Sequence, residues 1–263
     1  MTSRGTGRRR CKAMLDCVSL EKFVNSLRHE DSVVKSVSNP MNAESDSHPR
    51  RAMSVTGGLC GILGVVLLCA SFVFASGPPT NATPAELTQF GQEHHAGILI
   101  GAWLQSVAPV LIAVFAFVLV HLSGAASRVS GWLTFLGIST LMTVSMVEVT
   151  FYITAMSADP PGIALVSLKL VNAIQHLYFV VAAPAVFLPL SLILLRSSLL
   201  PAAFAYSAMA LGVIFFVLGA AYMLTVTLPS AVTAVGAIQA LWWLSAATAL
   251  AIRGARALRV QST

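Results

Sequence analysis

Six apolar stretches of roughly 22 to 28 residues make up most of the sequence after residue 53. An α-helix needs about 20 apolar residues to cross about 30 Å of hydrocarbon. A spanning segment must satisfy its own backbone hydrogen bonds, and these stretches lack the period-two alternation of barrel strands. The sequence therefore predicts an all-α polytopic membrane protein with six transmembrane helices. The predicted helices cover residues 54–76, 96–121, 131–157, 168–195, 202–226 and 231–252.

The composition excludes an ordinary water-soluble domain. Hydrophobic residues make up 56% of the 263 residues, charged residues 10%, and the mean hydropathy is +0.80. In soluble proteins roughly a quarter of the residues are charged. The connections between the apolar stretches are short and contain turn residues such as Gly77-Pro78-Pro79 and Leu228-Pro229-Ser230. Short connections predict that neighbouring helices form an antiparallel bundle.

The first connection is the exception in length, at about 20 residues. Its sequence Thr83-Pro84-Ala85-Glu86 has an N-cap threonine, a proline at the first helical position and the acid of a capping box. We expect a short helix there, which leads through His94 and His95 into the second span.

The arginines that follow residue 51 alternate with the predicted spans. All five lie in the second and fourth connections or after the last span, whereas the opposite side holds only Lys169, at the very start of the fourth predicted span. Cytoplasmic loops carry an excess of Lys and Arg, so this pattern predicts a multi-pass protein of the cytoplasmic membrane with both termini in the cytoplasm. The five arginines are Arg128, Arg196, Arg253, Arg256 and Arg259.

Residues 1–51 differ in composition from residues 52–263, which hold the transmembrane domain. The first segment carries ten Lys or Arg and six Asp or Glu with few aromatics, a composition typical of disorder. We expect a cytosolic basic tail; start codons at Met41 or Met53 would instead make most of it a mis-assigned extension. A cleaved signal peptide is an alternative for the first span, although its apolar run exceeds the usual signal core of about 7 to 15 residues.

Motifs of catalytic, metal or cofactor sites are missing from the sequence. The four cysteines include no Cys-x-x-Cys pair, and the chain contains no phosphate loop, zinc-binding helix motif or dinucleotide fingerprint. We therefore expect no metal, no cofactor and no nucleic-acid partner, and an enzyme is the least favoured class. The lipid bilayer is the partner that the composition predicts.

Four predicted spans each place one polar side chain at a similar depth. Counted from the outer ends of the helices, Gln105, Glu148, His176 and Gln239 lie about eight or nine residues deep, or roughly 12 to 14 Å. An acid near the bilayer centre costs about 2.5 to 3.5 kcal/mol on insertion scales, so Glu148 should face protein groups or water.

Helical spacing places further polar residues beside this layer. Ser145 and Tyr152 share a face with Glu148, and Lys169, Asn172 and His176 form a stripe on the next span. We expect Glu148 to contact His176 in a polar pocket that opens outward.

Three functional hypotheses follow. In the first, Glu148 exchanges a proton or binds a cation, and the protein serves small-solute or proton-linked transport or sensing. In the second, Glu148 only ties helices together, and the protein is a non-enzymatic assembly or scaffold subunit. In the third, His94 or His95 pairs with His176 to hold a haem in a membrane electron carrier.

Small residues at helical spacing predict close helix packing, either within the chain or with a homo-oligomeric or other membrane partner. The glycines in these stripes are Gly57, Gly61, Gly64, Gly97, Gly101, Gly212 and Gly219.

Several short motifs share an order with known membrane proteins. Arg50-Arg51 precede Gly57-Gly58, Gly101-Ala102-Trp103-Leu104 lies in the second span, and Gly131-Trp132 opens the third. In this order the chain resembles uncharacterised bacterial six-span integral membrane proteins that are grouped as domains of unknown function. The resemblance implies a bacterial inner membrane location and carries no catalytic residues.

Overall fold

The computed structural model describes residues 47–74, 77–78, 82–157, 161–224 and 229–259. We expected disorder in residues 1–51, and positions 1–46 of this segment lie outside the described residues. Residues 47–51, which we assigned to the tail, instead begin the first helix. The compact unit described below begins at Pro49.

The described residues form helices joined by short loops, without a strand. Six of these helical segments are long and apolar enough to cross a membrane, which confirms the prediction of an all-α, six-span chain. A π-helical turn, η2, divides the fourth span into α7 and α8. The elements are α3 (Ser47–Phe74), α4 (Pro84–Glu93), α5 (His95–Leu122), α6 (Val129–Ser157), α7 (Pro161–Leu177), η2 (Tyr178–Ala182), α8 (Ala183–Arg196), α9 (Ala202–Leu224) and α10 (Pro229–Arg259).

The predicted helix boundaries were least accurate in the first, fourth and sixth spans, each by seven residues at one end. We expected the fourth span to begin at residue 168, but α7 begins at Pro161, because proline is well suited to the first turn of a helix. The sixth helix continues to Arg259, seven residues past the predicted end at 252. The turns beyond residue 252 carry Arg253, Arg256 and Arg259, so hydropathy alone places them outside the span.

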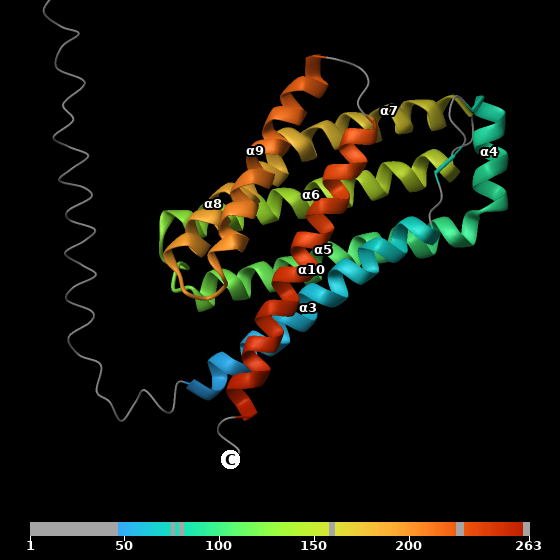
Figure 1. Cartoon of the computed structure of the whole chain (residues 1–263). Helices are drawn as coiled ribbons and strands as arrows, with labels where there is room; N and C mark the ends of the chain where they lie inside the picture. The colour runs from blue at the N-terminus through green and yellow to red at the C-terminus, as the bar shows by residue number, and fades with distance from the viewer. Residues whose placement is uncertain (1–46, 75–76, 79–81, 158–160, 225–228, 260–263) are drawn as a thin grey trace, which may run out of the picture. The chain divides into compact units, whose positions relative to one another are not determined.

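Neighbouring helices are antiparallel and pack through glycine. Gly57 of α3 lies against Val118 of α5, whereas Gly64 lies against Ala108, nearer to the start of α5. On its other side α3 contacts α10, where Ser54 donates a hydrogen bond to the carbonyl of Leu250 at 3.1 Å. In Figure 1, α5, α6 and α7 run side by side, and α10 crosses them at an angle.

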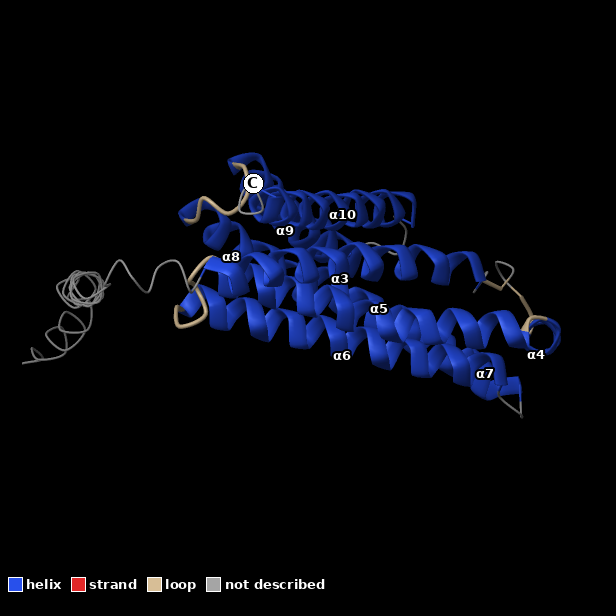
Figure 2. Cartoon of the chain, turned by 90° about the horizontal axis from the view of Figure 1, so that it is seen from below, coloured by secondary structure: helices blue, strands red, loops and turns tan. Residues whose placement is uncertain are grey.

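The two ends of the bundle differ in chemistry. Figure 2 shows α4 at one end of α5–α7 and the loops that follow α5 and α8 at the other. Arg50 and Arg51 lie at the end with these loops, since Arg50 donates a hydrogen bond to Leu122 at the end of α5. Arg253 joins them through the carbonyl of Ser198. We call this the arginine end, and the opposite end the α4 end.

The outward faces of the helices are apolar. Phe72 and Val73 of α3 are 66% and 79% exposed, Trp103 of α5 is 63% exposed, and Val217 of α9 is 57% exposed. Soluble monomers rarely expose contiguous apolar patches larger than a few hundred Å². A surface of this kind is suited to lipid, as a multi-pass membrane protein requires.

The core lies between α5, α8, α9 and α10 and is rich in aromatic rings. Phe187 of α8 stacks on Phe215 of α9 and meets Trp242 and Trp243 of α10 edge-on or tilted. The indole of Trp242 donates a hydrogen bond to the Ser207 hydroxyl at 2.9 Å. These contacts hold the last three helices together.

The predicted packing glycines lie at helix contacts within the chain. Gly57, Gly61 and Gly64 face α5, with Gly61 also against Ala247 of α10. Gly97 approaches the Phe74 carbonyl, and Gly101 is buried in α5. Gly212 packs on Leu188 of α8, and Gly219 packs on the backbone of η2.

Gly137 of α6 makes one of the closest contacts. A Cβ atom at this position would lie 2.3 Å from the carbonyl oxygen of Ala185 in α8. We predict that Gly137→Ala lowers the free energy of unfolding by about 1 to 3 kcal/mol, because the backbone of α8 must move away. The thermal unfolding midpoint in detergent measures this change.

The matched control is Gly236→Ala in α10, where an added Cβ meets nothing within 4 Å. Alanine favours helix over glycine by up to about 1 kcal/mol, so this variant should be neutral or more stable. Equal midpoints for the two variants would contradict the close α6–α8 contact.

The short helix α4 confirms the predicted capping box. The Thr83 hydroxyl accepts a hydrogen bond from the Glu86 backbone N–H at 3.3 Å, and the Glu86 carboxylate accepts one from the Thr83 backbone N–H at 2.7 Å. Gly91 of the same helix abuts the carbonyl oxygen of Met156 at the end of α6. The cap and this contact place α4 across the ends of α5–α7 (Figure 2).

The capping box makes the stability of α4 depend on pH. Hydrogen bonds from the Thr83 backbone N–H and hydroxyl lower the pKa of Glu86 below its ordinary value, which is about 4.3 for Glu. The contribution to stability is therefore complete above that ordinary value and is lost as the pH falls through the lowered pKa of the folded state.

We predict that hydrogen-exchange protection of the α4 amides, normalised to the intrinsic rate, falls as the pH is lowered through this pKa. In Glu86→Gln, which retains an acceptor oxygen without titrating, this fall should be absent; an unchanged fall would rule out Glu86 as its cause.

Candidate functional site

Glu148 is placed in the third span by the regular helix α6. It lies nine residues before Ser157 at the α4 end of that helix, or about 14 Å along the axis. The side chain is half-buried, and its Oε1 accepts a hydrogen bond from Nε2 of Gln175 in α7 at 2.8 Å. The acid is thus held against the neighbouring helix by a neutral amide.

A second polar contact lies one turn further along the fourth span. The hydroxyl of Tyr178 donates a hydrogen bond to Oε1 of Gln239 in α10 at 2.6 Å. Gln239 is only 8% exposed, so this contact satisfies an amide oxygen deep in the apolar bundle. Gln175 and Tyr178 are three residues apart and share one face of the helix, so this face of the fourth span links α6 to α10.

The π-helical turn begins at Tyr178. The N–H of Ala183 bonds to the carbonyl of Tyr178, five residues back, and Pro184 follows immediately. Proline in a helix removes one hydrogen bond and its ring crowds the carbonyl four residues before it, here that of Val180. A wide turn just before the proline relieves this crowding, and single π turns occur frequently at functional sites.

The structure separates the other predicted pocket residues into two groups. Ser145, Tyr152 and Gln105 are half-buried, and Tyr152 packs against a small core of Ile98, Ala155 and Met156. On α7, however, the predicted stripe faces outward: Lys169 and Asn172 are exposed. His176 is half-buried, with its Nδ1 2.6 Å from the carbonyl oxygen of Asn172 on its own helix.

Gln175 and Tyr178 are the residues that sequence reasoning missed. Ser167 is buried at 4% exposure, and it lies eight and eleven residues before Gln175 and Tyr178 on the same helical face. The spacing of these three polar residues is visible in the sequence and could have indicated the buried face of the fourth span. Lys169 was the misleading member of the predicted stripe, because the long side chain of a lysine keeps its charged group in water, and Lys169 is exposed.

The histidines considered for a haem lie in different elements. His94 and His95 are exposed at the junction of α4 and α5, and the His94 ring stacks on Phe90 with a centroid distance of 4.4 Å. His176 belongs to α7. Among the described residues no group of three or more His, Cys, Asp or Glu side chains is arranged to hold a metal ion. The haem hypothesis stays a prediction.

Comparison with known proteins does not assign the chain to a family. No protein-family model, curated protein or solved structure matches it. The resemblance to uncharacterised six-span proteins therefore stays an expectation.

The Tyr178–Gln239 contact should contribute measurably to stability. Hydrogen bonds between membrane helices contribute about 0.6 kcal/mol on average and up to about 1.7 kcal/mol in double-mutant cycles. We predict a coupling energy in this range between Tyr178→Phe and Gln239→Leu, measured from unfolding midpoints in detergent. Tyr206→Phe is the control, because Tyr206 is 64% exposed and its hydroxyl should have no such coupling to Gln239. A coupling of zero for the Tyr178 pair would contradict the contact.

Proposed function

We propose that this multi-pass membrane protein acts in proton- or cation-linked transport or sensing, with Glu148 as the group that gains and loses the proton. The observation that carries the proposal is the hydrogen bond from Gln175 to Glu148 within the membrane-spanning part of α6 and α7. Ionisable residues at such positions usually mark ion or proton pathways.

The identity of the partner favours a change of protonation state. A lysine or arginine beside Glu148 would favour the ionised carboxylate strongly. The amide of Gln175 donates through its nitrogen to an ionised carboxylate, and its oxygen accepts from a protonated carboxyl group. A glutamine partner can therefore retain the α6–α7 contact in both states, as a proton-exchanging site requires.

The fourth span provides a route by which such a change affects the rest of the bundle. Gln175, which bonds Glu148, lies one turn from Tyr178, which bonds Gln239 of α10. The π turn between Tyr178 and Ala182 interrupts the regular α-helical hydrogen bonding of this span. We infer that α7 is the segment that shifts when Glu148 changes its proton.

The orientation follows from the charges. If the arginine end faces the cytoplasm, as the positive-inside rule predicts, Glu148 lies nearer to the outer surface. The predicted polar pocket would then open outward at the α4 end.

A scaffold role is the second candidate, and its main support is weaker than the sequence implied. The glycine stripes that favoured a partner helix are occupied within the chain, where Gly57 and Gly64 contact α5 and Gly212 contacts α8. The exposed aliphatic faces suit lipid as well as a partner.

Glu148→Gln tests the proposal, because glutamine retains the shape and can still accept from Gln175. Hydrophobic carbodiimides react with protonated carboxyl groups in apolar surroundings. In the wild-type protein we predict an adduct on Glu148 whose yield falls as the pH rises. We also predict that the unfolding midpoint depends less on pH in Glu148→Gln than in the wild type. In proteoliposomes, loss of an imposed pH gradient that requires Glu148 would distinguish transport from sensing.

Glu93→Gln is the matched control. Glu93 also accepts a hydrogen bond from a glutamine, Gln89, at 2.8 Å, but on the exposed outer helix. This variant should retain the adduct on Glu148 and the pH dependence of the midpoint. If Glu148 forms no adduct at any pH and Glu148→Gln leaves the pH profile unchanged, the proton role is wrong.

A further inference from the structure

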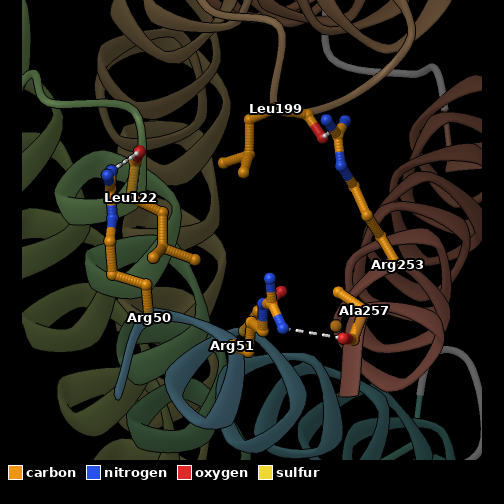
Figure 3. A pocket seen from close by; sticks show the side chains of 8 residues that line it. Arg50, Arg51, Leu122, Leu199, Arg253 and Ala257 are labelled. Atoms are coloured by element: carbon orange, nitrogen blue, oxygen red, sulfur yellow. Dashed lines mark hydrogen bonds between the residues drawn. The ribbon is translucent and has the colours of Figure 1, made fainter. Parts of the chain in front are cut away.

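A cavity of about 180 Å³ lies at the arginine end of the bundle, far from Glu148 along the helices. Figure 3 shows its walls, which come from the start of α3, the end of α5, the loop after α8 and the end of α10. The side chains that form it are mostly cationic or aliphatic. They include Arg50, Arg51, Arg253, Ser54, Leu122 and Leu199.

Each of the three arginines is held in place by backbone carbonyl groups. Nη2 of Arg50 donates to the carbonyl of Leu122 at 3.1 Å, and Nη1 of Arg51 donates to that of Ala257 at 2.9 Å. These acceptors end α5 and lie near the end of α10, where helical carbonyls lack partners within the helix. The guanidinium groups therefore cap helix ends and border the cavity at the same time (Figure 3).

Arg253 approaches from the opposite wall of the cavity. Its Nη1 donates to the carbonyl oxygens of Ser198 and Leu199, both at 2.6 Å. A guanidinium group has five N–H donors, and the observed bonds of each arginine use only one nitrogen. Donors thus remain for a ligand.

The cavity lining carries no negative charge. None of its eight lining residues is acidic. Among the described residues the carboxylates are Glu86 and Glu93 in α4 and Glu148 in α6, all nearer to the α4 end. Three cations around one partly enclosed space repel one another, and an anion between them offsets this repulsion.

The positive-inside rule explains why arginines occur on this side of the membrane. It does not explain why residues from the two ends of the transmembrane domain, some 200 positions apart in sequence, converge on one cavity. The planar fork of arginine matches phosphate oxygens with paired hydrogen bonds. Basic pockets between transmembrane helices at the cytoplasmic surface are suited to anionic headgroups.

We propose that this cavity binds the phosphate group of an anionic ligand, either a lipid headgroup or free phosphate. A volume of about 180 Å³ is far above the roughly 10 to 15 Å³ that a single water needs, so the cavity accommodates a phosphate group. Arg51 and Arg253 supply donors from facing walls, while Leu122 and Leu199 supply an apolar side suited to the glycerol part of a lipid.

The test uses the full-length chain in a neutral detergent. One arm adds phosphatidylglycerol, with phosphatidylcholine for comparison, and the other adds inorganic phosphate, with chloride at equal ionic strength. Binding is followed by the rise in the unfolding midpoint. We expect phosphatidylglycerol or phosphate to stabilise the protein more than its comparison compound does. Stabilisation by the lipid alone identifies a headgroup site, and stabilisation by both identifies a site for which phosphate suffices.

The variants are Arg51→Gln and Arg253→Gln, each expected to weaken binding about tenfold, as loss of a charged hydrogen bond implies. Arg128→Gln is the control, because it removes the same charge from the same end but lies outside the cavity lining. If a glutamine variant fails to fold, Arg51→Lys or Arg253→Lys retains the charge and should still weaken binding relative to wild type.

The proposal is overturned if neither anionic probe exceeds its comparison compound, or if Arg128→Gln weakens binding as much as Arg51→Gln. Glu148→Gln should leave this binding unchanged, so the result is independent of the proton role proposed above.

Discussion

Hydrocarbon offers no hydrogen-bond partner to a peptide group, and this constraint governs both the regular and the irregular parts of the bundle. It requires six nearly uninterrupted helices. Where proline interrupts the hydrogen-bonding pattern, at Pro109, Pro184 and Pro189, each proline is buried. Irregular backbone therefore occurs where neighbouring helices cover it, and the lipid-facing surface carries exposed apolar side chains instead.

The close glycine contacts fit the same constraint. Pro189 leaves the carbonyl of Ala185 without its usual partner four residues on, and Gly137 of α6 approaches that same carbonyl group. Gly219 of α9 likewise approaches the backbone of the π turn before Pro184. A side chain at either glycine would hold the helices apart. The small residues thus serve the irregular fourth span as well as general packing.

The sequence predicted the features that depend on near neighbours or on length. Helix number follows from apolar length, and the capping box of Thr83 and Glu86 follows from spacing within one turn. The partner of Glu148 depends on the rotation of α7 about its axis, and one residue along a helix turns the face by about 100°. Depth placed His176 near Glu148, yet the observed hydrogen bond comes from Gln175, its immediate neighbour. The orientation in the membrane, the outward pocket and the contact between Glu148 and His176 stay predictions.

The polar groups divide the bundle into two regions with different requirements. At the arginine end, charged side chains bond to neutral carbonyls near the end of α10 and in the loop after α8, so their charges are not neutralised by these contacts. Within the spans, Glu148 and Gln239 bond to neutral partners on the fourth span. A neutral partner costs less to bury than a charge. Under the function proposed above, the two hydrogen bonds, one turn apart on the fourth span, connect a change of protonation at Glu148 to α10.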